Sequence, residues 1–390
     1  MAFVYGWLSL LVTDPGVTAM LALGVAPYVG HLISLSPWGL KAVAVGSIIV
    51  LAAVNTLGVS PGSRVMGALT AFKLGLLGFI VIWGLGMGRG DWSNLTPFWS
   101  QRPGSDQLLP ALGLGLVGAF AAFAGWWDVS KIAGEVLDPK KAMPRALMLG
   151  VSIVTVVYIA VSVVFLYLVA PSRIAEDSGA FAALAGEALF GRRGEIIFSL
   201  VVVIAVAGTM AGYFMAAPRV YFAMARDGLF FASFGAVDPR RDVPARGTVV
   251  QATLAVAFAL AFNFEQILSF IMVPTLLMLA ITVSGTFVLR HRHPGERALA
   301  PPGYPISPLL FLVPMVTVIL MQLMRFPVPG FIALAVVALG IPVAAWLIPE
   351  RRSTDESNAP ESTTEPTNRD SKLDESSAVP FIGTGSSITK

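Results

Sequence analysis

The chain has 390 residues, of which 56% are hydrophobic and only 13% are charged, and its formal net charge is +3. Soluble domains carry about 25% charged residues, so this composition indicates an integral membrane protein. No Lys/Arg run is interleaved with aromatic residues, which argues against nucleic-acid binding. The absence of cysteine excludes disulfides, thiolate metal sites and cysteine nucleophiles.

Ten hydrophobic stretches approach the length of about 20 residues that a helix needs to cross a bilayer. In chain order they cover residues 2–32, 40–60, 65–87, 108–130, 146–170, 195–217, 247–264, 266–289, 306–324 and 330–348. None shows the short alternating pattern of a barrel strand. The sequence therefore predicts an all-α integral membrane domain over residues 1–350.

The segments between and after the spans carry further expectations. Only Asn263–Gln266 joins the seventh and eighth spans, so we expect a tight hairpin there. The segment 171–194 is amphipathic and mixed in charge, and we expect a short surface helix on the side away from the basic loops. Residues 351–390 are rich in Ser, Thr, Asp, Glu, Asn and Pro, which predicts a disordered polar tail in the cytoplasm.

The distribution of basic residues predicts the orientation in the membrane. If the N-terminus is cytoplasmic, the loops on the cytoplasmic side carry fifteen Lys and Arg residues and the outer loops carry seven. The positive-inside rule then predicts a multi-pass membrane protein with both termini in the cytoplasm. No signal-peptide pattern is recognisable, so we expect the first span to act as its own insertion signal and to remain in the protein.

Two polar residues in the first two spans have alternative roles. Asp14 is followed by Pro15 and Gly16, a combination that predicts a kink. Its side chain could line a cavity, pair with a cation or cap the helix that restarts after it. Asn55 is expected to cap the end of the second span beside Gly58.

Lys73 lies well inside the third span, where an ionised side chain costs at least about 2.5 kcal/mol. One interpretation is that it reaches toward the cytoplasmic face, because Arg64 lies close before it in the sequence. The alternative is a role in transport. The amine could exchange a proton, or it could be a fixed positive charge where a sodium ion would otherwise sit.

The segment Phe120–Leu149 combines an apolar helix, small residues, two adjacent tryptophans and a basic loop closed by Pro144. A helix that is broken within the membrane leaves free backbone groups, which are tolerable only beside a polar ligand or a cavity. The alternative is close helix packing through small residues around Gly125. Because Asp128 and Lys131 follow within about a turn, the segment favours a substrate site.

At this point the sequence resembles a known family. GWWDVSKIAGEVLDPKKAMPRAL is similar to the signature of the amino acid–polyamine–organocation (APC) superfamily, in particular its L-type amino acid transporter branch. The matching positions are Gly125, Trp126, Glu135, Lys140, Lys141, Pro144, Arg145 and Ala146. Three further segments resemble the family in the same order, namely AVNTLGVSPGSRVMGALTAFKLG, APRVYFAMARDGLFF and PPGYPISPLLFL. The first of them contains Lys73 at the position of the family's fifth-helix lysine.

The resemblance implies a LeuT-type inverted-repeat transporter fold, in which the ten spans correspond to family helices 3–12. The glycine-rich sequence of the family's first helix, whose amides hold the substrate carboxylate, does not occur here. The implied function is sodium-independent transport of amino acids across the cell (plasma) membrane by alternating access, proton-coupled or by exchange. The three histidines are scattered and no phosphate loop occurs, so we expect no enzyme activity, cofactor or metal. The alternative is a non-transporting protein: a truncated paralogue, a partner subunit or a mis-started gene model. The oligomeric state stays open.

The resemblance also implies a substrate site at the broken sixth helix. Its unwound backbone would present carbonyl groups to the substrate ammonium, and Gly125 would allow close approach. The implied substrate-binding residues are Phe120, Ala121, Ala122, Phe123, Ala124, Gly125 and Trp126. Phe123 or Trp126 would be candidates for an aromatic gate. Ala121 stands where relatives often carry a bulky gating aromatic, and a small residue there would leave more room for a large or aromatic substrate. Lys73 would serve coupling, and Glu135 would lie at the cytoplasmic mouth.

Overall fold

The computed structural model describes residues 2–58, 63–96, 108–127, 136, 138–176, 180–237, 244–292 and 303–347. Within these ranges the chain forms helices and turns and no strand. Met1–Pro349 form one compact unit. The predicted polar tail, residues 351–390, lies outside the described residues.

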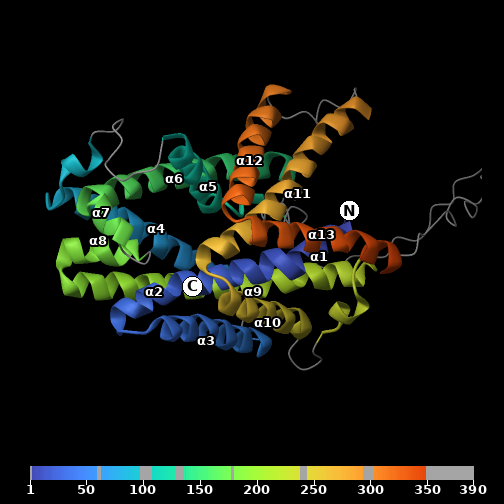
Figure 1. The fold of residues 1–390 in the computed structure, drawn as a ribbon, viewed down its shortest axis with the longest axis horizontal. Helices are drawn as coiled ribbons and strands as arrows, with labels where there is room; N and C mark the ends of the chain where they lie inside the picture. The colour runs from blue at the N-terminus through green and yellow to red at the C-terminus, as the bar shows by residue number, and fades with distance from the viewer. Residues whose placement is uncertain are drawn as a thin grey trace, which may run out of the picture. The chain divides into compact units, whose positions relative to one another are not determined.

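The helices follow one another along the chain as Figure 1 shows. Their bounds are α1 Ala2–Leu8, the π-helix η1 Ser9–Thr13, α2 Asp14–Leu32, α3 Pro37–Thr56, α4 Ser63–Gly86, the 3-10 helix η2 Trp92–Leu95, α5 Leu108–Ala122, α6 Pro139–Leu168, α7 Pro171–Glu176, α8 Phe181–Phe190, α9 Arg192–Arg226, the 3-10 helix η4 Ala232–Gly235, α10 Ala245–Ala261, α11 Phe264–Arg292, α12 Ile306–Arg325 and α13 Pro327–Leu347.

A helix stands at each of the ten predicted spans, which confirms an all-α membrane protein. Within the described ranges, seven helical segments are long and apolar enough to cross a bilayer: Ala2–Leu32, Pro37–Thr56, Lys141–Leu168, Arg192–Arg226, Phe264–Arg292, Ile306–Arg325 and Pro327–Leu347. The apolar runs of the other three are shorter, at Thr70–Gly86, Ala111–Ala122 and Ala245–Ala261. Many large apolar side chains of the long helices are exposed, as lipid contact requires.

A group of four helices, α2, α3, α9 and α10, packs around a core rich in alanine (Figure 1). Ala19, Ala22 and Ala26 of α2 face Ala44 and Ala52 of α3, and the alanines of α10 complete this core. Helices approach closely where the side chains between them are small, which gains dispersion contacts that lipid tails cannot supply. A second group forms around α11, which packs on α12 and α13, while α5 packs on α12.

The kink expected after Asp14 takes the form of a π-helical turn. Pro15 has no N–H, so it cannot continue the regular hydrogen-bond ladder of the helix. The turn Ser9–Thr13 widens instead, and the Asp14 N–H donates to the Ser9 carbonyl five residues earlier. Helix α2 then begins at Asp14 with Pro15 in its first turn, where proline is favoured.

Two connections differ from the sequence-based expectation. The basic segment around Pro144 is helical, because α6 already begins at Pro139, in the first position where proline fits well. Segment 171–194 contains two short helices, and α8 is packed against α9 with Ala183, Leu184 and Leu189 buried. A single surface helix was therefore the wrong prediction for that segment.

The short link before α11 is a reciprocal cap. Gln266 N donates to Asn263 Oδ1 at 2.8 Å, and Asn263 N donates to Gln266 Oε1 at 3.0 Å. The turn is as tight as predicted, but the helices diverge after it. Helix α10 packs on α2 and α3, whereas α11 also contacts α2 but packs mainly on α12 and α13.

Candidate functional site

Helix α5 ends inside an apolar stretch, at the place where the sequence predicts a broken helix. The last residue of α5 is Ala122, and the backbone turns at residues 123–125. Phe123 N still donates to the Ala119 carbonyl at 3.0 Å, whereas Ala124 N donates to Ala121 O at 3.2 Å in a tighter turn. Gly125 has φ = 96°, a conformation that residues with a Cβ rarely adopt.

Helix α6 supports this break from the side. The hydroxyl of Tyr158 donates to the Ala122 carbonyl at 3.0 Å, which satisfies an acceptor at the helix end. The Tyr158 ring also meets Phe123 edge to face, with centroids 5.3 Å apart and planes at 73°. The sequence analysis did not single out Tyr158, because nothing local marks a tyrosine of one span as the partner of another.

A cavity of about 240 Å³ lies against the break. Its lining comes from α5, the following turn, α11 and α12: Leu116, Ala119, Phe120, Phe123, Trp126, Trp127, Leu276, Leu279 and Phe311. Trp126 and Phe311 meet edge to face with centroids 6.0 Å apart. Five of these nine side chains are aromatic and none is charged, so the cavity suits an apolar group.

The structure thus brings together three of the predicted substrate residues, Phe120, Phe123 and Trp126. The small residues among the predictions do not line the cavity. The carbonyls of Ala121 and Ala122 each accept one hydrogen bond, from Ala124 N and Tyr158 respectively. A carbonyl oxygen has two lone pairs, so each retains capacity for one further donor.

Six residues of the lining were not among the predicted substrate residues. Leu116, Ala119 and Trp127 flank the predicted segment, whereas Leu276, Leu279 and Phe311 come from other helices. Leu276 and Leu279 are spaced three apart on α11, and this helical face alone is indistinguishable from ordinary core packing. Phe311 falls within the segment PPGYPISPLLFL that carries part of the family resemblance, which was the available signal.

A larger depression of about 560 Å³ runs along α11 between Ala280 and Leu289. Its walls come from that single helix, so it is an open groove on the surface of α11. The cavity at the break is lined by several helices and lies beside irregular backbone. It is therefore the better candidate for a ligand site.

Lys73 takes part in a different contact. Its Nζ donates to Thr209 Oγ1 of α9 at 2.7 Å, and the Thr209 hydroxyl donates to the Ala205 carbonyl at 3.0 Å. Lys73 does not line the cavity at the break. Glu135, the residue predicted at the cytoplasmic mouth, lies outside the described residues, as do Asp128 and Lys131.

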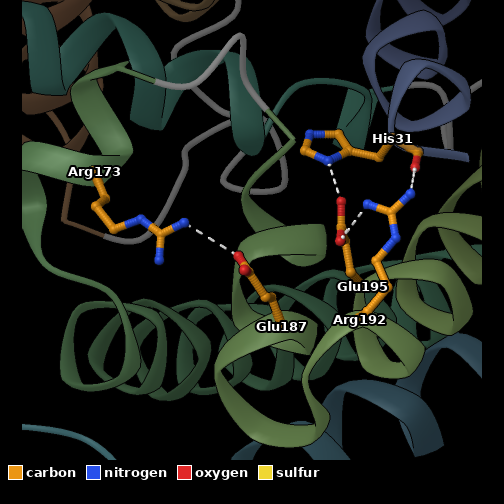
Figure 2. A network of polar contacts seen from close by, with 5 residues as sticks. All are labelled: His31, Arg173, Glu187, Arg192 and Glu195. Atoms are coloured by element: carbon orange, nitrogen blue, oxygen red, sulfur yellow. Dashed lines mark hydrogen bonds and ion pairs between the residues drawn. The ribbon is translucent and has the colours of Figure 1, made fainter. Parts of the chain in front are cut away.

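A polar cluster connects the end of α2 to the start of α9 (Figure 2). The Glu195 carboxylate accepts from His31 Nδ1 at 2.7 Å and from Arg192 Nη1 at 2.9 Å. Arg192 also donates to the His31 carbonyl at 3.4 Å. Nearby, Arg173 and Glu187 form a more exposed pair at 3.2 Å. Within the described residues, no group of three or more His, Cys, Asp and Glu side chains could hold a metal ion.

Comparison with known proteins places these features in a family. The family profile described as "Amino acid permease" matches residues 1–357. The chain belongs to this amino acid permease family. The resemblance to the APC superfamily, drawn above from four sequence segments, is thereby confirmed.

Individual relatives are more distant. The chain is 28% identical over 315 residues to the serine/threonine exchanger SteT of Bacillus subtilis. This aligned region covers 79% of the present chain and 69% of SteT. The chain is 25% identical over 294 residues to the b(0,+)-type amino acid transporter 1 of Oryctolagus cuniculus, covering 74% and 59%. It is 26% identical over 356 residues to the human cystine/glutamate transporter, covering 87% and 68%. The aligned region therefore spans between 59 and 69% of the length of these three relatives.

Proposed function

We propose that this chain transports amino acids across the cell membrane by alternating access, with the substrate held at the break after α5. The observation that carries the proposal is the irregular backbone at Phe123–Gly125 beside a cavity, in a chain of the amino acid permease family. Carbonyl groups at such a break have no partner in a continuing helix, so they can accept hydrogen bonds from a substrate ammonium group. The surroundings contain little water, which strengthens each of these hydrogen bonds.

The chemistry of the cavity supports a substrate class. An amino acid has a zwitterionic head and a side chain, and only the side chain can favourably enter a cavity lined by apolar residues. The aromatic rings of Phe120, Phe123, Trp126 and Phe311 offer large contact areas to an apolar side chain. We therefore propose neutral amino acids with bulky apolar side chains, such as leucine, as substrates.

The remaining roles follow the family resemblance. Lys73 is the coupling residue, and transport is sodium-independent, by exchange or with proton coupling. Glu135 lies at the cytoplasmic mouth. Both termini are cytoplasmic, and the membrane domain covers residues 1–350. The hydrogen bond from Lys73 to Thr209 supports its role, because it holds the amine between α4 and α9 instead of at a helix end.

The test is uptake of radiolabelled L-leucine into liposomes that contain the purified full chain, preloaded with unlabelled L-leucine. Gly125→Leu should abolish this uptake, because a side chain at φ = 96° is strained and would distort the turn that positions Phe123 and Trp126 at the cavity. Gly118→Leu is the matched control. It also lies in the α5 segment, but a Cβ there meets no atom within 4 Å, so uptake should persist.

Normal uptake kinetics in Gly125→Leu would show that this segment only packs helices. Absence of uptake by the unchanged chain, tested also with L-serine, L-cystine and L-glutamate, would contradict the proposed transport activity.

A further inference from the structure

A buried polar cluster in the four-helix group has no part in the site described above. Asp14 is only 3% exposed although it lies near the middle of the Ala2–Leu32 span. Its carboxylate accepts from Tyr213 at 2.7 Å on Oδ1 and from Tyr221 on Oδ2, and both tyrosines belong to α9. A carboxylate at this depth is costly, and such residues mark proton or ion pathways more often than packing positions.

A third helix contributes an unused acceptor. The Thr18 hydroxyl donates to the Asp14 backbone carbonyl at 2.8 Å, so it must accept from the Gln251 amide, whose Nε2 is 2.9 Å away. This fixes the amide orientation, because only the NH₂ group can donate. Gln251 Oε1 is then left without a hydrogen-bond donor in the described part of the chain, and Gln251 is fully buried.

The orphan acceptor Gln251 Oε1 belongs to the same hydrogen-bonded cluster as Asp14, to which Gln251 is linked through the Thr18 hydroxyl and the Asp14 backbone carbonyl. A buried acceptor without a partner costs about 1–3 kcal/mol. Protonation would convert the acceptor-only carboxylate into a group that also donates, and thus add a donor to a cluster that has an acceptor to spare. One bond forms, between a carboxylate oxygen and the incoming proton, and the negative charge is neutralised.

Charged side chains on the neighbouring helices α3 and α10 have partners elsewhere, and Arg219, which α9 carries between the two tyrosines, is exposed. Tyr5, Tyr213 and Asp14 interact electrostatically with Tyr221. On the neighbouring helices, Lys41 donates to Leu260 O and Arg246 to Ser233 O.

Near the start of α11, Glu265 faces Arg325 at 4.0 Å. Near the end of the same helix, Arg290 stacks over Tyr304. These groups lie near helix ends, far along the chain from the middle of a span. Tyr213 and Tyr221 are the ionisable side chains that donate to the Asp14 carboxylate.

We propose that the carboxyl of Asp14 is a proton-binding site inside the membrane-spanning helices, with Tyr213 and Tyr221 orienting it. A sodium ion is a poorer fit, because the site offers a single carboxyl group and each of its oxygens already accepts from a tyrosine. Use of this proton in transport rests on the proposed function. Helix α9 would then link Asp14 to Lys73. Tyr213 donates to Asp14, Thr209 accepts from Lys73, and these two residues of α9 are one turn apart.

The site itself is tested without any transport assay, by pH-difference infrared spectroscopy of the purified full chain in liposomes. A carboxyl C=O band should grow as the pH falls and should be missing from Asp14→Asn. Tyr213→Phe keeps the carboxyl but removes a donor that favours the charged form, so proton binding should tighten about tenfold.

The matched control is Asp91→Asn, which removes a carboxyl group outside the predicted spans. Hydrogen bonds from Ser93 hold the pKa of Asp91 below its ordinary value, and its removal should leave the band in place. An Asp14→Asn spectrum identical to that of the unchanged chain would overturn the proposal. So would a band in the unchanged chain that responds to added NaCl instead of pH.

The role in transport is tested in the same liposomes with a pH-sensitive dye inside. Asp14→Asn should retain exchange of labelled for unlabelled L-leucine, while leucine-driven proton movement falls at least about tenfold. Proton movement equal to that of the unchanged chain would overturn the coupling role. If the unchanged chain exchanges no leucine, the proposed function fails, and the infrared result still decides whether Asp14 binds a proton.

Discussion

Replacement of Glu195 by alanine should destabilise the protein substantially, because this carboxylate is the centre of the cluster between α2 and α9 (Figure 2). The Glu195 side chain is 10% exposed and that of His31 is 21% exposed, so their 2.7 Å contact is largely shielded from water. A hydrogen bond to a charged group in such a setting contributes about 1.5–3 kcal/mol. The Arg192 side chain is 66% exposed, so its contact adds only about 0.2–1 kcal/mol.

Together these terms predict a loss of about 2–4 kcal/mol in unfolding free energy for Glu195→Ala. The matched control is Glu187→Ala in the neighbouring pair with Arg173. Both of those side chains are well exposed, at 40% and 61%, so the control should lose at most about 1 kcal/mol. The assay is a titration with a denaturing detergent, followed by the fluorescence of the tryptophans.

The predicted difference between the two variants comes from burial, not from the presence of an ion pair. Equal losses of unfolding free energy for Glu195→Ala and Glu187→Ala would therefore contradict the prediction, as would a loss below about 1 kcal/mol for Glu195→Ala. Glu195→Gln should fall between the unchanged chain and Glu195→Ala, because the amide oxygen still accepts from His31 without the negative charge.

Three further predictions concern the break and Lys73. Gly125→Ala should cost about 1–3 kcal/mol of unfolding free energy, because residue 125 has a positive φ. Gly118→Ala in helical α5 should instead stabilise the protein by up to about 1 kcal/mol. Equal effects of the two substitutions on unfolding free energy would show that the turn imposes no strain. Trp126→Ala should raise the KM for L-leucine at least about tenfold, because it removes a cavity wall, and an unchanged KM would place the substrate elsewhere. Lys73→Ala should alter the pH dependence of uptake while the protein stays in the membrane, and Thr209→Val should do so more weakly; a pH profile identical to that of the unchanged chain would remove Lys73 from the mechanism.

Local features of the chain allowed most of the helices to be predicted. Hydropathy is a property of about 20 consecutive residues, so each predicted span coincides with a helix. The error at Pro144 has a local reason too. Proline at an internal position normally indicates a boundary, but Pro139 already begins α6, and the helix continues through Pro144.

Segment 171–194 shows where local patterns fail. An amphipathic pattern predicts a helix with one apolar face but does not say what covers that face. In α8 it is covered by α9, where Gly186 and Gly194 bring the two backbones so close that a Cβ on Gly186 would be 2.6 Å from the Gly194 carbonyl. Only the packing of the neighbouring helix distinguishes this from a surface helix.

The sequence by itself determined the membrane class, the helices, the family and the approximate position of the break, because each depends on residues close together in the chain. The break was predicted over Ala121–Gly125, but Ala121 and Ala122 are still helical and the backbone turns at Phe123–Gly125. The tertiary structure decided which side chains share a space. Leu276 and Phe311 join Trp126 at the cavity, and Tyr213 joins Asp14, across separations of about 150 to 200 residues. Such contacts depend on how helices pack and rotate against one another, and a hydrophobic helix that is apolar on all sides carries no pattern that specifies its rotation.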